Sequence, residues 1–263
     1  MIDVKSDAGI AVLTLMHGKA NALDVEFCEA LAARFVELRG ADAKAVVLTG
    51  QDKIFSAGVD LIRLSEGGAD YVRKFLPALH KLYDAVFNHP KPVVAAINGH
   101  AIAGGCVMTC AADYRVMAEG KATIGVPELK VGVPFPLVAI EILRFATLAG
   151  RLQELLFLGK TYLAKDAVLQ GLADEIVPAG KLEERAIEIA TRLTQEPVAR
   201  FRITKEQLRR PTREAIARHS AETDEAMIRA WEDATTLKAI AAYLEATVGK
   251  KEKGEGRREK GRS

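Results

Sequence analysis

The sequence predicts an α/β protein in which short buried strands alternate with helices, followed by a helical C-terminal third. The apolar runs at 45–49 and 93–97 are typical of buried strands, and each is followed by a segment with apolar residues at helical spacing. Strands that are separated by helices need crossover connections, which favour parallel pairing in one sheet.

The N-terminal region combines a strand pair with a helix. Apolar residues at 2–5 and 10–16 flank the turn sequence 6–9, which predicts a hairpin. Asp24 is a predicted N-cap, because apolar side chains at helical spacing follow it. The strand 45–49 then leads into a loop at 54–61, whose small residues allow a ligand to approach the backbone.

The second half of the chain continues the alternation before it becomes helical. A long helix with Phe75, Leu79, Leu82 and Val86 on one face ends before Pro90. The later predicted elements are a strand at 114–118, an irregular segment at 123–129, a stiff turn at 132–136, a helix at 137–145, a strand at 174–177 and a helical stretch at about 213–247.

Composition limits the class of protein. The chain has 263 residues, of which 49% are hydrophobic and 27% charged, as in soluble globular proteins. The net charge is +2, and residues 250–263 hold seven Lys or Arg against three Glu, so the remainder carries −2. The basic character therefore belongs to the tail, which we expect to be disordered, and binding to nucleic acid is not favoured.

Cysteine usage and hydropathy indicate a cytoplasmic protein. Cys28, Cys106 and Cys110 lie in apolar helical patterns without a preceding signal peptide, so we expect reduced, buried thiols. No apolar run approaches the ~18 to 20 residues of a membrane span. The sequence therefore predicts no membrane association.

The segment from Asn98 to Cys106 is the strongest candidate for a site. Asn98-Gly99 ends a buried strand, and Gly104-Gly105 begins an apolar helix. A helix N-terminus without side chains presents unpaired N–H groups to an anionic oxygen. The alternative is that the glycines only allow the strand and the helix to pack closely.

Three segments together resemble the crotonase superfamily of enoyl-CoA hydratases and isomerases. They are Ser56-Ala57-Gly58-Val59-Asp60-Leu61, 98–106, and Pro127-Glu128-Leu129-Lys130-Val131-Gly132. Segments 13–15, 21–23 and 164–178 are also similar, so the resemblance covers about residues 10–248. It implies a spiral of ββα units at 1–195, a helical region at 196–248 that forms trimers or dimers of trimers, and a charged tail at 249–263.

The resemblance also implies a substrate and a mechanism. Members of this superfamily bind acyl-CoA thioesters and hold the thioester enolate between two backbone N–H groups, which correspond here to Ala57 and Gly104. Coenzyme A belongs to the substrate, so no separate cofactor and no metal are expected. The substrate-binding residues that the resemblance implies are Lys19, Ala20, Ala22, Ser56, Gly58, Val59, Asp60, Leu61, Val107 and Phe135.

One carboxylate is present where the hydratases of the superfamily have two. Val107 occupies the position of the first glutamate, and Glu128 that of the second. Adding water to a 2-enoyl thioester needs one group to activate water and one to deliver a proton. A single base suits isomerisation of 3-enoyl-CoA to 2-enoyl-CoA, and hydration or another enolate-forming reaction is the alternative.

Other polar residues are weaker candidates. We expect His100 to form local hydrogen bonds and Glu141 to be solvated or paired within its helix. The remaining histidines lack partners at metal or triad spacing, and nucleotide-binding glycine patterns are absent. An RNA-binding protein or a scaffold without catalysis remains the non-enzymatic alternative.

Overall fold

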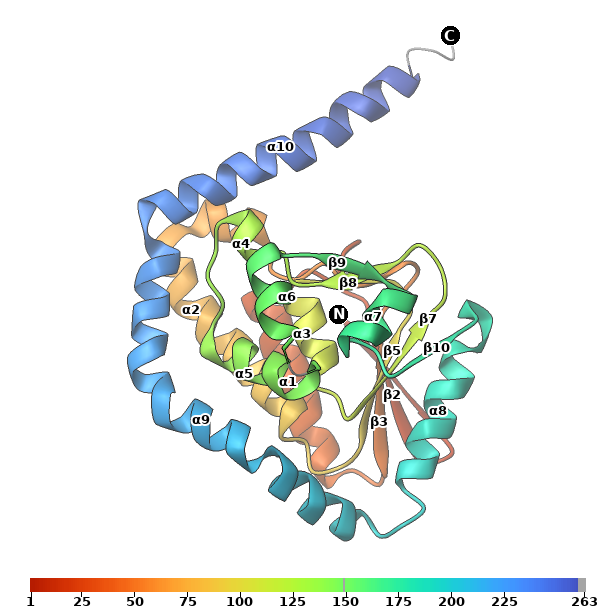
Figure 1. The fold of residues 1–263 in the computed structure, drawn as a ribbon. Coiled ribbons are helices and arrows are strands. Elements are labelled where there is room, and N and C mark those ends of the chain that lie inside the picture. Colours follow the sequence, from red (N-terminus) through yellow and green to blue (C-terminus); the bar gives the residue numbers. More distant parts are fainter. Residues whose placement is uncertain (149, 260–263) are drawn as a thin grey trace.

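The computed structural model describes residues 1–148 and 150–259, with side chains described up to residue 247 (Figure 1). The main sheet has the order β1-β2-β3-β5-β7-β10. Only β1 and β2 pair antiparallel, and the other neighbours are parallel, as the crossover connections require. Its strands are β1 (Ile2–Asp7), β2 (Ile10–Leu15), β3 (Ala45–Thr49), β5 (Val93–Ile97), β7 (Tyr114–Ala118) and β10 (Glu175–Val177).

A smaller sheet of order β4-β6-β8-β9 collects the short strands. These are β4 (Ile54–Ser56), β6 (His100–Ile102), β8 (Thr123–Gly125) and β9 (Thr161–Leu163). Each turn of the chain gives one strand to each sheet and then a helix, in the sets β3-β4-α2, β5-β6-α3 and β7-β8-α4. This arrangement confirms the predicted α/β class and the spiral of ββα units.

Helices cover both faces of the main sheet (Figure 1). Along β3, Val46 and Leu48 pack with α1 and α2, whereas Ala45 and Val47 pack with α8. The helices are α1 (Val25–Gly40), α2 (Leu61–Phe87), α3 (Gly104–Cys110), α4 (Glu128–Val131), α5 (Leu137–Ala146), α6 (Leu152–Leu158), α7 (Ala164–Gln170), α8 (Leu182–Leu193), α9 (Val198–Glu232) and α10 (Ala234–Glu259). No described helix has both the length and the apolar character needed to cross a bilayer.

Helix α9 packs against the spiral core through charged side chains. Lys205 and Arg209 are buried and contact Asp113 at 2.6 and 2.8 Å. Arg209 also donates hydrogen bonds to the carbonyls of Phe87, Ala111 and Ala112, at the C-terminal ends of α2 and α3. A cation at a helix C-terminus satisfies free carbonyls and the negative end of the dipole. The contact therefore stabilises both helix ends as well as α9.

The C-terminal helices differ in two ways from the sequence prediction. The stretch predicted as one helix is divided at Asp233, whose backbone is extended and whose carboxylate accepts from the amide of Thr235. The backbone of α10 is helical to Glu259, whereas composition predicted a disordered tail from 249. Lys, Arg and Glu are good helix formers, which favours this extension.

Candidate active site

Glu128 begins α4, directly after Pro127 and close to the end of β8. Its side chain is buried, with 7% exposure, and Oε2 has no hydrogen-bond partner in the described part of the chain. Burial raises the pKa of the Glu128 carboxyl to about 8. A carboxyl group that titrates near neutral pH can both accept and return a proton.

The N-terminus of α3 lies close to this carboxyl group. Burial first, and the charge of Glu128 second, raise the pKa of the Tyr83 hydroxyl, and Glu128 also contributes to the raised pKa of the Cys106 thiol. Tyr83 Oη donates a hydrogen bond to the carbonyl of Gly104 at 3.2 Å. Glu128 is therefore within electrostatic reach of the residues around Gly104.

The two glycines of α3 are required by close packing. A Cβ at Gly104 would lie 2.7 Å from Tyr83 Oη and 2.8 Å from Leu23, and one at Gly105 would lie 2.5 Å from the carbonyl of Ser56. The packing alternative is therefore correct. Close packing does not exclude that the N-terminus of α3 binds an anionic oxygen. The Gly104 amide has no acceptor among the backbone hydrogen bonds of the described residues.

The second predicted amide donor is already in use. The Ala57 N–H donates to the carbonyl of Ala20 at 2.9 Å, so this amide is not free, contrary to the sequence prediction. The Leu23 amide donates to Gly58, and the Asp60 amide donates to Leu23. These two bonds form a parallel bridge between Leu23 and Val59. Val59 lies between the two bonded residues of its loop, so its own amide points away from Leu23. This amide has no backbone acceptor within the described chain.

Gly58 brings this loop against α3. Its φ of +84° is in the left-handed region, and a Cβ there would lie 2.7 Å from the Cβ of Ala103 and 3.0 Å from the Gly104 nitrogen. The Val59 amide, which follows Gly58, is therefore next to the N-terminus of α3. Among the described residues, Val59 and Gly104 therefore each bring to this site a backbone N–H that has no backbone acceptor.

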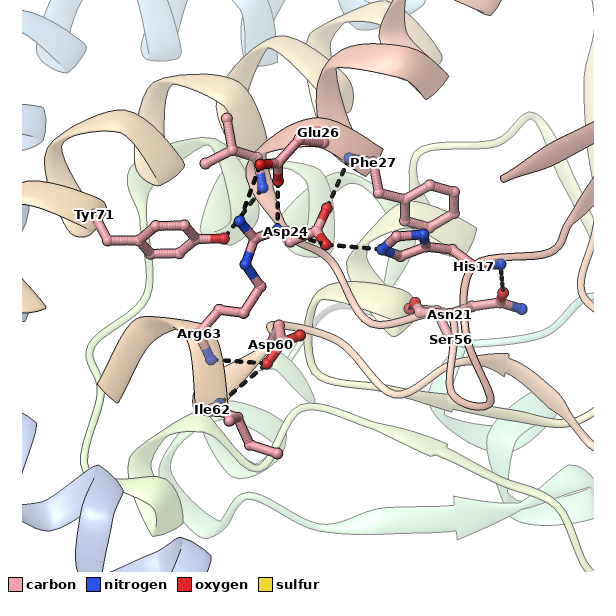
Figure 2. A network of polar contacts seen from close by, with 11 residues as sticks. His17, Asn21, Asp24, Glu26, Phe27, Ser56, Asp60, Ile62, Arg63 and Tyr71 are labelled. Carbon is pink, nitrogen blue, oxygen red and sulfur yellow. Dashed lines mark hydrogen bonds and ion pairs between the residues drawn. The ribbon is translucent and has the colours of Figure 1, made fainter. Parts of the chain in front are cut away.

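Asn21 connects the two predicted substrate loops (Figure 2). Its side chain accepts from the His17 amide at 2.7 Å and donates to the Phe55 carbonyl at 3.1 Å. Ser56 is fully buried, and its hydroxyl donates to the Asn21 carbonyl at 2.7 Å. Ser56 therefore has a structural role, and Asn21, which was not predicted as a site residue, holds the loops together.

Figure 2 also shows an ion-pair network at the start of α1 and α2. Asp24 accepts from the Phe27 amide at 2.7 Å, as the predicted N-cap, and from His17 and Arg63 at 2.8 and 3.0 Å. Burial acts to raise the pKa of Asp24, but the hydrogen bonds from Phe27, His17 and Arg63 outweigh it and lower this pKa. Arg63 also contacts Glu26 at 2.9 Å. The network fixes the two helix starts beside the site.

The remaining predicted residues have varied positions. Asp60 caps α2 by accepting from the amides of Ile62 and Arg63. Val107, one turn after Gly104, is buried, as is Phe135. Residues 19, 20, 22 and 61 are exposed or half-buried beside these loops.

Two of the weaker candidates, His100 and Glu141, form the contacts predicted for them. His100 hydrogen-bonds locally to Thr123, and Glu141 pairs with Arg144 in the same helix at 3.2 Å. Among the described side chains, no group of three or more His, Cys, Asp or Glu residues is arranged to hold a metal ion.

The C-terminal helices cover the segment that follows Glu128, a feature that the sequence did not predict. Trp231, at the end of α9, is buried, contacts Phe75 and donates from Nε1 to the Pro134 carbonyl at 3.0 Å. Ile240 of α10 is fully buried, and Ala239 contacts Gly132. Helices of the same chain therefore cover the segment 132–134, which directly follows α4.

Comparisons with known proteins identify relatives that match most of this chain. A family model described as enoyl-CoA hydratase/isomerase matches residues 5–251. A protein of Thermus thermophilus named as an enoyl-CoA hydratase is 36% identical over 194 residues, covering 72% of this chain and 76% of its own. Enoyl-CoA delta isomerase 1 of Rattus norvegicus mitochondria is 27% identical, and the match covers 95% of this chain and 88% of that protein. The structure of human mitochondrial delta3-delta2-enoyl-CoA isomerase has a TM-score of 0.90 at 25% identity. The match covers 95% of this chain and 99% of that structure.

Proposed function

Because the chain belongs to the enoyl-CoA hydratase/isomerase family, we propose that it converts 3-enoyl-CoA to 2-enoyl-CoA with Glu128 as its one acid–base group. The observation that carries this proposal is a single buried carboxyl with an unpaired oxygen, in a site where the neighbouring position is Val107. Similarity to a mitochondrial delta isomerase over 95% of the chain supports it.

The proposed reaction needs one carboxylate and two backbone donors. The Glu128 carboxylate removes a proton from C2 of the acyl chain, and the electron pair of that C–H bond shifts into the thioester to form a dienolate. The amides of Val59 and Gly104 hydrogen-bond to its oxygen, and donors fixed in this way lower the barrier. The carboxylic acid then returns the proton to C4, so the double bond has moved and Glu128 is ionised again.

The proposal also includes a mode of substrate binding, an assembly and a location. The coenzyme A portion lies along Lys19–Ala22 and Ser56–Leu61, and Val107 and Phe135 border the acyl chain. No cofactor beyond the substrate's own coenzyme A is needed. The protein acts in the cytoplasm as a trimer or a dimer of trimers.

Hydration of 2-enoyl-CoA is the second candidate. It is favoured by the Thermus thermophilus relative and by the raised pKa of Glu128, since a carboxyl that holds a proton near pH 7 can act as a general acid. In that case a water molecule must be activated without a second carboxylate.

Product analysis separates the two reactions. The purified protein is incubated in heavy-oxygen water with matched 3-enoyl-CoA and 2-enoyl-CoA thioesters. Chromatography separates the two isomers, which have the same mass, and mass spectrometry detects the hydrated product. The proposal expects 2-enoyl-CoA of unchanged mass from the 3-enoyl substrate. Fast formation of 3-hydroxyacyl-CoA with incorporated label and negligible isomerisation would establish the hydratase instead.

The pH dependence of catalysis reports the state of Glu128. A base must be ionised, and burial raises the pKa of this carboxyl from 4.5 to about 8. We expect kcat/KM for isomerisation to rise about tenfold per pH unit below this pKa and to level above it. Stopped-time assays between pH 5.5 and 9.5 measure this profile, and a plateau that begins near pH 5 would contradict the raised pKa.

Gly58→Ala tests the loop that carries the Val59 amide. The added Cβ meets Ala103 and the Ile102 carbonyl at 2.7 Å, and an L-residue is strained at this φ. The loop must shift, and a displacement of about 1 Å in a catalytic group costs on the order of 10²-fold. We expect kcat to fall by that amount, while Gly40→Ala, which meets no neighbouring atom, leaves kcat unchanged. Equal kcat values in both variants would show that this loop does not position a catalytic amide.

A further inference from the structure

A hollow lies away from the proposed active site, where α1 and α2 end against α9. It is a cavity of about 780 Å³. Its basic lining residues are Arg39, Arg202, Lys205, Arg209, Arg210 and Arg213, against the acidic Asp84, Glu206 and Glu214. Basic side chains therefore outnumber acidic ones around this space, whereas the chain as a whole is almost neutral.

Some of these basic groups have partners in the protein and others do not. Lys205 and Arg209 are bound to Asp113, and Arg202 lies 3.8 Å from Glu206. Arg39, Arg210 and Arg213 have no ion pair within the described residues. Within one chain, three guanidinium groups at the cavity wall therefore have no described counter-charge.

His89 is a buried polar side chain at the edge of the same cavity. Its side chain is fully buried and lines the cavity, yet neither Nδ1 nor Nε2 has a hydrogen-bond partner among the described atoms. Burial first, and then the charges of Lys205, Arg39 and Lys91, lower the pKa of His89 to about 3. The ring is neutral and still has one N–H to donate. A buried donor without an acceptor is unfavourable, so His89 adds an unsatisfied polar group beside the basic side chains.

We propose that this cavity binds a small anion with two or more phosphate groups. The planar guanidinium fork of Arg matches phosphate oxygens, and a space of this size is within the range of small-molecule sites. Phosphate oxygens would contact Arg210 and Arg213 on α9 and Arg39 on α1.

The cavity is separate from the proposed thioester site. Arg39 is in the last turn of α1, whereas Asp24 and the loop 19–22 precede its first turn. A helix of 16 residues is ~24 Å long. Likewise, Asp84 is near the C-terminal end of α2, and the loop 56–61 leads into its N-terminus. The two sites can therefore be filled independently.

Calorimetry with inorganic pyrophosphate tests this proposal. Pyrophosphate is titrated into the full-length protein in the absence of any coenzyme A ester, because the phosphates of coenzyme A could themselves occupy this cavity, and the variants below localise the binding. We expect one site per chain, with affinity lowered about tenfold by Arg210→Gln and by Arg213→Gln. Arg218→Gln removes the same charge from an exposed position of α9 outside the cavity, and we expect it to leave the affinity unchanged.

Two results would overturn the proposal. One is the absence of binding heat in the wild-type protein, which would also be the outcome if another chain closed the cavity. The other is an equal affinity in Arg213→Gln and Arg218→Gln, which would mean that pyrophosphate responds only to overall charge. Circular dichroism of each variant checks that the fold is retained. Because thioester turnover is measured separately, failure here leaves the proposed enzymatic function unaffected.

Discussion

Glu128→Gln is expected to lower kcat for double-bond migration by about 10²- to 10⁴-fold. The amide has nearly the same size as the carboxyl but cannot accept the C2 proton. Since the Glu128 side chain is buried and its Oε2 is unpaired, no described neighbour takes over this role. Steady-state turnover of a 3-enoyl-CoA measures the loss, and calorimetry with a saturated acyl-CoA is expected to show a dissociation constant within a few-fold of wild type.

Glu141→Gln is the matched control. This carboxyl is also buried, at 9% exposure, but it pairs with Arg144 within α5. We expect its kcat to stay near the wild-type value. If Glu128→Gln retained most of its turnover, or if both variants lost it equally, Glu128 would not be the base.

Asp113→Asn is expected to reduce the free energy of unfolding by about 3–5 kcal/mol. Asp113 accepts from Lys205 at 2.6 Å, from Arg209 at 2.8 Å and from the Val93 amide at 2.8 Å, and all three side chains are at least nine-tenths buried. The variant leaves two cations in the interior without a counter-charge. Urea denaturation followed by circular dichroism measures the loss.

A double variant distinguishes the ion cluster from simple damage to packing. Lys205→Met in the Asp113→Asn background removes one of the two uncompensated cations. The double variant should therefore lose clearly less unfolding free energy than the two single variants lose in sum. Asp70→Asn, at an exposed position of α2, should stay within about 0.5 kcal/mol of wild type. Strict additivity of the two buried substitutions would show that the charges do not interact.

The strands and the ββα order could be predicted from the sequence because their signal is local. An apolar run such as 93–97 is buried whichever helices cover it. The docking of α9 could not be predicted, because Lys and Arg at helical spacing normally indicate a solvated face. Only the three-dimensional contact with Asp113 turns Lys205 and Arg209 into buried residues.

The candidate site also combines residues that the local sequence predicts with residues that depend on distant contacts. Glu128 and Gly104 could be selected from their sequence context, and the structure places them in one region. The choice of Ala57 as a donor was wrong because the free amide of that loop depends on its pairing with residues 20–23, which are distant in sequence. Trp231 carried no motif, and its place over Pro134 depends on how α9 folds back.

The charged contact beneath α9 has a consequence for how the protein responds to its medium. Ions in solution weaken interactions between exposed charges, but they act much less on pairs from which water is excluded. Arg200–Glu196 and Arg229–Glu225 face solvent, whereas Lys205–Asp113 does not. High salt should therefore weaken the exposed ion pairs of α9, while α9 itself stays packed on the core through Lys205 and Asp113.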